Sequence, residues 1–411
     1  MSSTPRSARR RSAFAATAVA AALAVTATAC GPEDDNADAK PTDSQSAESK
    51  PERDLKDELG LPDDLPDKLP SSLDDLKKWR DGDWKNWDKD RWLREAKDFF
   101  NPIIEDLWDS DRMKDADKND RQKDRREVDE SEIDDDPSGG EGGSGEDEGV
   151  TDPEPRPVRA KPTPTPYDGD DRPVGKVFMD TPKGSMVCSG TVIADPKNPG
   201  KSNLVATAGH CVHGGQGKGW FRNVIFAPDY NPQGKDGSEL DQSDQKAVAP
   251  HGVWWAKHAR TTSHWINNGA ERGGKGAQQD FAVMDMQPEN KGTSKSLEET
   301  VGGSIPVAFN TPRVKSLSQL TSHGYPAAPP FEGSKQYSCT SKPGRLTIDT
   351  TQPSMYRIGC TMTAGASGGG ILSADGKRLL SVNSIGPATA TWLAGPRLGK
   401  DAKQVFESLS K

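Results

Sequence analysis

Short apolar runs separated by Gly, Pro and Asn fill the part of the chain that follows Arg172. Runs of this length, bounded by turn-forming residues, are typical of β-strands. Many such strands in succession predict an all-β fold, either a barrel or a sandwich. The predicted strands are Lys176–Met179, Met186–Ile193, Leu204–Thr207, Phe281–Met284, Gly370–Leu372 and Leu379–Val382.

One helix is predicted at the C-terminal end of this part. Ala402, Val405, Phe406 and Leu409 recur at the i, i+3, i+4 and i+7 spacing. This spacing places the four side chains on one helical face. We therefore expect a C-terminal helix with one apolar side.

A second helical pattern lies in residues about 71–110. Trp and other large apolar side chains recur there at three- and four-residue steps, and Pro102 should break or kink the helix. Two interpretations are open: a small hairpin that packs its own apolar stripe, or a regulatory or pro-segment helix that docks on the part after Arg172. A helix lying on a membrane is disfavoured, because its polar face is not predominantly basic.

Residues 1–30 have the pattern of a signal peptide. A basic stretch from Arg6 to Arg11 precedes an apolar run, Ala13–Ala29. The run has 17 residues, which is short for a membrane-spanning helix, and it is the one uninterrupted apolar run of the sequence. The sequence therefore predicts an exported protein and excludes one that crosses a membrane several times.

Cys30 follows two small residues at the end of this signal. The run Ala27–Cys30 resembles a bacterial lipobox, in which the Cys is lipidated and becomes the mature N-terminus. The five Cys of the chain are an odd number, which leaves one without a disulfide partner. We expect lipidation of Cys30 and an outward-facing lipid anchor in the cell membrane; plain secretion with an incidental Cys is the alternative.

Composition divides the chain into unlike parts. Hydrophobic residues make up only 31% of it and its net charge is −9, but residues 31–170 carry −21 and residues 171–411 carry +8. The low apolar share belongs to residues 31–171, which we interpret as an acidic tether containing the Trp-rich helical segment. Its end, Lys161–Pro166, alternates with Pro and predicts a stiff linker, so the domain boundary is expected near Arg172.

A short acidic pattern inside this tether has the start of a calcium-binding loop. Asp115, Asp117 and Asn119 match the first ligand positions, but Asp120 stands where the loop requires Gly and Arg126 where it requires Glu. We therefore interpret these residues as a solvated charge run and expect no metal site in the chain.

Three motifs after Arg172 carry chemistry. They are Thr207–Cys211 (Thr-Ala-Gly-His-Cys), Asp280–Val283 (Asp-Phe-Ala-Val) and Gly365–Gly369 (Gly-Ala-Ser-Gly-Gly), and each lies beside a predicted strand. Acyl transfer needs a nucleophilic hydroxyl, a base that takes its proton and a carboxylate that orients the base. The motifs supply one of each, in the order His, Asp, Ser.

This order and these motifs resemble the trypsin-like (chymotrypsin-fold) serine peptidases, over about residues 172–411, and look nearest to the glutamyl endopeptidase branch. The resemblance implies two six-stranded antiparallel β-barrels. It implies Ser367 as nucleophile, His210 as general base and Asp280 as the orienting carboxylate. The backbone amides of Gly365 and Ser367 would form the oxyanion hole, and Ser384 would hydrogen-bond the catalytic Asp.

The same resemblance implies two disulfides. Cys188 and Cys211 would hold the loop that carries the His. Cys339 and Cys360 would form a bridge beside the nucleophile loop.

Specificity is less well marked. Thr361, Met362, Ser384 and Gly386 occupy the positions at which family members bind substrate. Thr361 stands where trypsins place an Asp, so cleavage after Lys or Arg is not expected. The later strand has no His at Ser381–Ser384, which argues against glutamate specificity and favours a mostly uncharged pocket.

Ala366 stands where many relatives carry an Asp before the nucleophile, the residue that pairs with the N-terminus released on activation. Activation through that ion pair is therefore excluded.

The sequence thus predicts an exported serine endopeptidase that acts on protein or peptide substrates without a cofactor. Nucleic acid is not expected as a partner, because the +8 charge is spread along the C-terminal part. The acidic tether is a candidate for intramolecular docking, as an inhibitory pro-segment. The alternative from another class is a catalytically inactive trypsin-like binding module.

Overall fold

The computed structural model describes residue 99 and residues 101–121, 147–270 and 273–411. All of them belong to one compact unit, Lys50–Lys411. The predicted signal peptide, Cys30 and most of the Trp-rich segment lie outside the described residues. Within the described part, no helix is long and apolar enough to cross a membrane.

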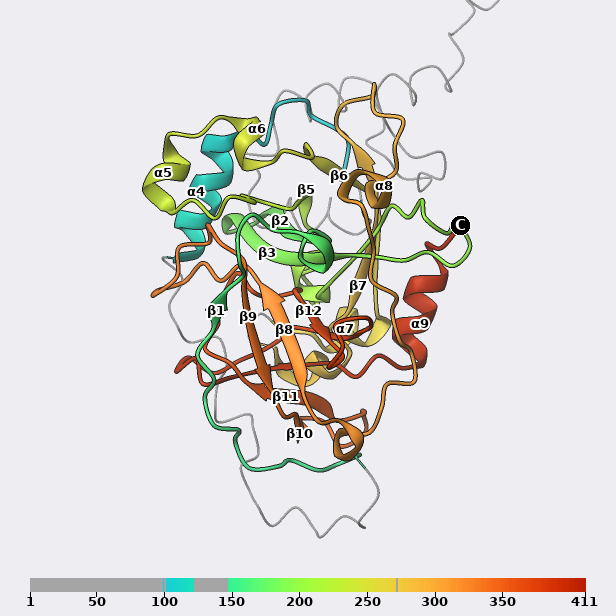
Figure 1. Cartoon of the computed structure of the whole chain (residues 1–411). Coiled ribbons are helices and arrows are strands. Elements are labelled where there is room, and N and C mark those ends of the chain that lie inside the picture. Colours follow the sequence, from blue (N-terminus) through green and yellow to red (C-terminus); the bar gives the residue numbers. More distant parts are fainter. Residues whose placement is uncertain (1–98, 100, 122–146, 271–272) are drawn as a thin grey trace, which may run out of the picture. The chain divides into compact units, whose positions relative to one another are not determined.

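Six antiparallel strands form a closed barrel in the order β2-β3-β4-β7-β6-β5. Figure 1 shows them in green and yellow. Closure leaves no unpaired sheet edge. The strands are β2 (Val174–Thr181), β3 (Gly184–Ile193), β4 (Leu204–Thr207), β5 (Arg222–Pro228), β6 (Trp254–Thr261) and β7 (Ala282–Pro288).

The strands that follow form two further antiparallel sheets, one of five strands in the order β1-β9-β8-β12-β13 and one of three in the order β10-β11-β14. Together with the closed barrel they confirm the predicted all-β fold and are consistent with a double barrel. The strands are β1 (Lys161–Pro162), β8 (Leu320–Gly324), β9 (Tyr337–Ser341), β10 (Gly344–Leu346), β11 (Met355–Gly359), β12 (Gly370–Leu372), β13 (Leu379–Val382) and β14 (Trp392–Gly395).

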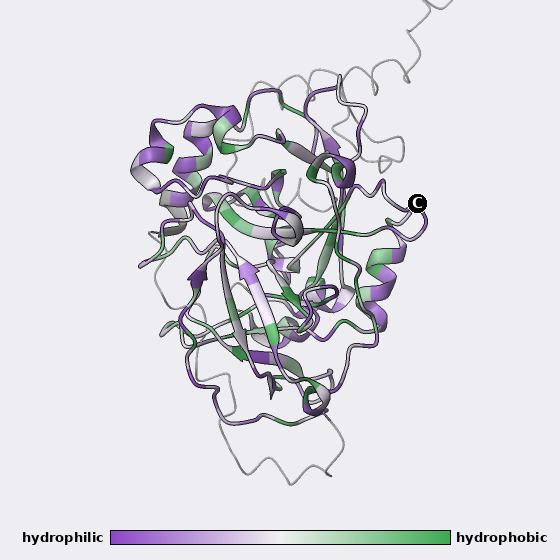
Figure 2. Ribbon diagram, viewed as in Figure 1, coloured by the Kyte–Doolittle hydropathy of each residue, from purple (hydrophilic) through white to green (hydrophobic). Residues whose placement is uncertain are grey.

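The helices of the described residues are short and lie outside the barrel. The last of them, α9 (Lys400–Glu407), confirms the predicted C-terminal helix: Ala402, Val405 and Phe406 on the helix, and Leu409 just after it, belong to the core of the first barrel. Figure 2 shows green and purple residues along α9, as expected for an amphipathic helix. The others are α4 (Ser110–Arg121), α5 (Gly237–Asp241), α6 (Gln245–Val248), α7 (Ser263–Asn268) and α8 (Leu297–Val301).

Strand β2 is buried along its whole length, although successive side chains of a strand point to opposite faces. Val177 and Met179 belong to the core inside the barrel. Phe178 points the other way and belongs to a second apolar cluster that includes Trp108 and Met113. The outer face of β2 is therefore covered by residues that precede the barrel by some sixty positions.

These preceding residues make specific contacts with the barrel. Trp108 is buried and donates its indole N–H to the carbonyl of Asn223, at 2.7 Å. Arg112 forms an ion pair with Asp180, in which Nη2 lies 2.8 and 2.7 Å from the two carboxylate oxygens. The interpretation of the acidic run as solvated is wrong for Asp117, which is buried and forms an ion pair with the equally buried Lys176.

The residues just before Arg172 also contact the β-structure. Lys161 and Pro162 form β1, which pairs with β9. Asp152 forms a bidentate contact with Arg345, and Asp147 pairs with Arg397 at 3.0 Å. The last stretch of the acidic segment is therefore packed along the second group of sheets.

Candidate active site

The three predicted catalytic residues lie at the ends of barrel strands or in the loop that leads to the second sheets. His210 is the middle residue of a single 3₁₀ turn, Gly209–Cys211, directly after β4. Asp280 follows another 3₁₀ turn and precedes β7. Ser367 lies in the loop between β11 and β12. Because β4 and β7 are paired, their adjoining ends bring His210 and Asp280 together.

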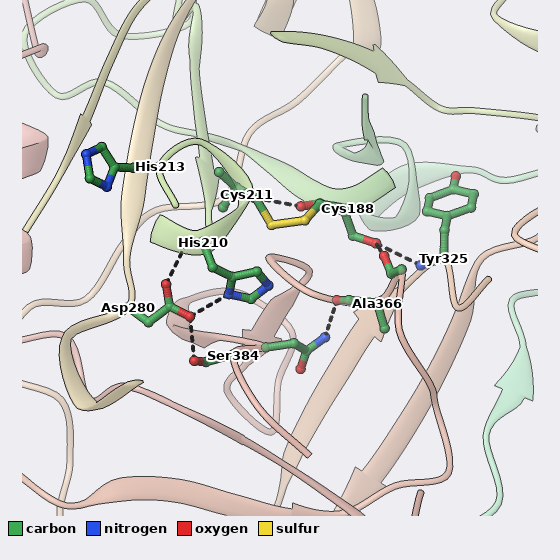
Figure 3. The surroundings of a disulfide bond; sticks show 12 residues. Cys188, His210, Cys211, His213, Asp280, Tyr325, Ala366 and Ser384 are labelled. Carbon is green, nitrogen blue, oxygen red and sulfur yellow. Dashed lines mark hydrogen bonds and ion pairs between the residues drawn. A yellow bond between two sulfur atoms is a disulfide. The ribbon is translucent and has the colours of Figure 1, made fainter. Parts of the chain in front are cut away.

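Asp280 is fully buried and its carboxylate accepts three hydrogen bonds (Figure 3). Oδ1 accepts the backbone N–H of His210 at 2.8 Å. Oδ2 lies 2.6 Å from His210 Nδ1 and accepts the hydroxyl of Ser384, also at 2.6 Å. A neutral imidazole that donates from Nδ1 carries its lone pair on Nε2, which is the form required of a general base.

Both predicted disulfides are present. Cys188–Cys211 ties β3 to the turn that carries His210, and Cys339–Cys360 ties β9 to the chain just after β11. Cys188, His210 and Cys211 are the one group of potential metal ligands in the described part of the chain. Their two sulfurs are bonded to each other and are not available as thiolates, so this group is a disulfide beside a histidine.

The nucleophile loop has a backbone that only glycine adopts without strain at one position. Gly365 has a φ of 95°, and a Cβ there would lie 2.6 Å from the carbonyl oxygen of Tyr325. The carbonyl of Ala364, which precedes it, accepts the N–H of Ala327 at 2.6 Å. Since C=O and N–H of a trans peptide point in opposite directions, the N–H of Gly365 points away from Ala327.

A cavity of about 190 Å³ opens beside Ser367. Met362, Ser384 and Gly386 line it, as does Ser367 itself, whereas Thr361 does not: its hydroxyl accepts the N–H of Ala160 at 2.9 Å. No charged side chain is among the residues that line this cavity. The lining comprises Ala328, Pro329, Pro330, Met362, Thr363, Ala364, Ser367, Asn383, Ser384, Ile385, Gly386, Pro387, Ala388, Thr389, Ala390 and Leu393.

Comparisons with known proteins identify the family of the chain through solved structures alone. No protein-family model matches the chain, and no curated protein matches it. Among solved structures, it is 32% identical to the thermostable serine protease AL20 from an extremophilic microorganism, over 59% of this chain and 98% of that one, with a TM-score of 0.47. This chain belongs to the trypsin-like serine protease family.

Two other members of this trypsin-like group are similar to it. The protease Anisep from Arthrobacter nicotinovorans is 27% identical, over 58% of this chain and 95% of that one, with a TM-score of 0.46. A Glu endopeptidase solved in complex with MPD is 17% identical, over 64% of this chain and 100% of that one, with a TM-score of 0.43.

Three other ionisable groups of this trypsin-like domain are not part of the predicted triad: His213, His323 and Asp285. Burial lowers the pKa of both His213 and His323 to about 4, so both rings are neutral at neutral pH. Asp285, the other carboxylate near the Asp280 motif, lies 2.6 Å from Lys411 Nζ. Burial opposes ionisation of Asp285, but the hydrogen bonds from His258 and Lys411 prevail and lower its pKa.

Two residues of the site are not among those predicted. Ser189 donates its hydroxyl to the carbonyl of Gly365 at 2.8 Å and its N–H to the carbonyl of Ser367 at 2.6 Å. Asn383 donates its side-chain amide to the carbonyl of Ala366 at 3.0 Å. Both could have been suspected from their place in the sequence, because each is a polar residue next to a predicted site residue: Ser189 follows Cys188, and Asn383 precedes Ser384.

Proposed function

We propose that the protein is a serine endopeptidase that hydrolyses peptide bonds through an acyl-enzyme on Ser367. The observation that carries the proposal is the buried Asp280 carboxylate, which accepts one hydrogen bond from the backbone N–H of His210 and one from its ring. It does so within a fold that also places Ser367 at an open cavity. A carboxylate, an imidazole and a hydroxyl in this setting are the components of acyl transfer.

The roles follow from the chemistry of each group. Ser367 Oγ attacks the scissile carbonyl carbon while His210 Nε2 accepts the hydroxyl proton. His210 then delivers that proton to the amide nitrogen, the C–N bond breaks and the amine leaves. Water attacks the resulting ester with His210 again as base, which releases the acid and restores Ser367. Asp280 keeps the imidazole in the required tautomer and stabilises its charged form.

The negative oxygen of the tetrahedral intermediate requires two hydrogen-bond donors. We assign them to the backbone amides of Gly365 and Ser367. The carbonyl of Ala364 supports this assignment, because its hydrogen bond with Ala327 directs the Gly365 N–H away from Ala327, and the φ of 95° is one that glycine adopts without strain.

The lining of the cavity predicts the preferred substrate residue. A substrate side chain that enters it meets no charged partner, so a buried Lys, Arg or Glu side chain would lose hydration without compensation. In a library of peptides that differ only before the scissile bond, cleavage should favour uncharged residues by at least about tenfold. Preferred cleavage after a charged residue would contradict this.

A fluorophosphonate probe tests the function directly. Wild-type protein should be labelled once, and peptide mapping should place the adduct on Ser367. The variant Ser367→Ala should take no label under the same conditions, because the attacking oxygen is absent. A folded wild-type protein that takes no label would favour the alternative, an inactive binding module, and a label elsewhere would refute the assignment.

Export and anchoring are the part of the proposal that rests on sequence alone. The signal-like residues 1–30 and the lipobox-like run before Cys30 support an outward-facing lipid anchor. The intact mass of the mature protein used for labelling tests it: a mature N-terminus at Cys30 without a diacylglyceryl adduct would contradict lipidation.

We also propose that the acidic segment is held on the peptidase domain through residues 101–117. The contacts of Trp108, Arg112 and Asp117 with the first barrel support this. Within the described part of the segment, no residue lines the cavity beside Ser367. A structural role therefore fits these contacts better than inhibition of the cleft.

A further inference from the structure

The peptide bond between Ala366 and Ser367 decides where one oxyanion donor points. In a planar trans peptide the C=O of one residue and the N–H of the next point in opposite directions. The carbonyl of Ala366 accepts the Nδ2 amide of Asn383 at 3.0 Å and the N–H of Gly369 at 3.1 Å (Figure 3 shows the Ala366 carbonyl with its partner). The N–H of Ser367 therefore points away from Asn383.

Asn383 contacts the nucleophile loop on both sides of Ser367. Besides the bond to Ala366, its own carbonyl accepts the N–H of Gly368 at 2.7 Å, and its N–H donates to the carbonyl of Gly369 at 2.9 Å. One residue, only 1% exposed, thus fixes the residue before the nucleophile and the two residues after it. Its place directly after β13 anchors the loop to the sheet.

The side chain of Asn383 is itself held in one orientation. Oδ1 accepts the hydroxyl of Ser322 at 2.7 Å, and Nδ2 also donates to the carbonyl of His323 at 2.9 Å. A hydroxyl donor on one side and a carbonyl acceptor on the other determine which end of the amide faces Ala366. A rotated amide would set an oxygen against two carbonyls, so the donor is fixed toward the loop.

Ser189 holds the loop from the first barrel. Its hydroxyl and its N–H hold the carbonyls of Gly365 and Ser367, at 2.8 and 2.6 Å. These hydrogen bonds and those of Asn383 are all formed by uncharged groups, and Ala366 has no side-chain charge that could hold the loop instead. The conformation of the loop thus depends on neutral hydrogen bonds within the described domain.

We propose that Asn383 is a positioning residue of the reaction: its side-chain amide fixes the Ala366–Ser367 peptide plane and so aims the Ser367 N–H at the oxyanion. The proposal rests on the proposed function, because an oxyanion forms only if Ser367 attacks a carbonyl. Asn383 acts through this peptide. Asn383 is among the residues that line the cavity, but it is only 1% exposed, so it contributes to the transition state and little to the binding of the ground state.

The variant Asn383→Leu tests the proposal, because Leu has nearly the same shape but no hydrogen-bonding group. Without the amide, the Ala366 carbonyl keeps only the N–H of Gly369 at 3.1 Å, so the Ala366–Ser367 peptide is held less firmly and the Ser367 N–H turns away from the oxyanion. We expect kcat to fall by about 10²–10³, the usual effect of losing one oxyanion donor, while KM for a substrate with an uncharged side chain changes by less than about threefold. A peptide aldehyde, which forms a tetrahedral adduct, should bind about 10²-fold more weakly.

Ser381→Ala is the matched control. Ser381 is also buried, lies two residues earlier in β13, and donates its hydroxyl to the carbonyl of Pro396 at 2.7 Å rather than to the nucleophile loop. We expect it to lower the melting temperature and leave kcat unchanged. If lost stability were the cause of a fall in kcat, kcat would fall in both variants. If Asn383 positions the peptide, kcat falls only in Asn383→Leu.

A second variant decides the matter if Asn383→Leu does not fold. Ser322→Ala keeps the amide but removes the donor that orients it, and kcat should fall by about tenfold at similar KM. If Asn383→Leu folds and keeps the full kcat, the proposal is overturned. If Asn383→Leu does not fold, full kcat in Ser322→Ala overturns it instead. A variant in which KM rises while kcat is unchanged also contradicts the proposal. If the wild-type protein neither takes the fluorophosphonate nor cleaves any peptide, the proposed function fails and this proposal fails with it.

Discussion

Replacing Asp280 with Asn should lower kcat by about 10⁴ while the protein stays folded. The backbone N–H of His210 cannot change its direction, so the remaining side-chain oxygen must stay at the Oδ1 position to accept it. The new NH₂ group then takes the place of Oδ2, opposite His210 Nδ1. It can only donate there, which forces the ring proton onto Nε2 and leaves His210 unable to accept the proton of Ser367.

The measurement is kcat and KM on a peptide with an uncharged residue before the cleaved bond, with melting temperature as the folding check. Ser384→Ala is the matched control, because it removes one of the three hydrogen bonds to Asp280 without changing the tautomer of His210. We expect it to cost only about tenfold in kcat. Equal losses in the two variants, or a loss below tenfold in Asp280→Asn, would show that the tautomer of His210 does not control the reaction.

The features that sequence could predict are those that depend on local pattern. All six predicted strands overlap strands of the structure, because each is a short, largely apolar run bounded by turn-forming residues. The C-terminal helix was predictable because the apolar residues of the predicted face, three on α9 and Leu409 just after it, all belong to the barrel core. The predicted triad residues lie within three residues of predicted strands, His210 after β4, Asp280 before β7 and Ser367 before β12, where motif and turn signals coincide.

Strand β11 was not predicted, and it carries a buried charge in the middle of its short sequence. β11 contains Arg357, which is 2% exposed, and a charged residue in a short apolar run argues against a buried strand. Arg357 is accommodated because its guanidinium donates to the carbonyl of Asp152 and lies 5.4 Å from the centre of the Trp392 ring. Asp152 precedes Arg357 by 205 positions, so no local pattern connects the two.

Long-range charge pairing also explains why the acidic segment was not predicted to pack on the β-structure. Asp147, Asp152 and Asp117 belong to a run of charge that, taken alone, resembles a solvated tether. In the structure each of them pairs with an Arg or Lys that follows the predicted boundary at Arg172. The opposite net charges of the two parts of the chain, −21 and +8, were visible in the sequence, but the pairings were not.

The largest stability effect is expected at Lys176. This side chain is fully buried on the outer face of the first barrel, donates to Gly333's carbonyl at 2.8 Å and lies near the Phe178 and Tyr230 rings, 5.0 and 4.6 Å from their centres. The Asp117 carboxylate compensates its charge. Asp117→Ala leaves the ammonium in an apolar site, so the free energy of unfolding should fall by about 3–5 kcal/mol, measured by denaturant titration of the full, oxidised protein.

The double variant Asp117→Leu with Lys176→Met separates the contribution of the ion pair to stability from that of side-chain packing. It removes both charges and keeps apolar volume, so it should recover most of the stability lost in Asp117→Ala. Glu407→Ala is the control, because it breaks an ion pair with Lys403 in which each side chain is 50% exposed. We expect it to lower the free energy of unfolding by less than about 1 kcal/mol. If Asp117→Ala costs no more than Glu407→Ala, the charge of Lys176 is compensated without residues 101–117, and this part of the acidic segment is not required by the barrel.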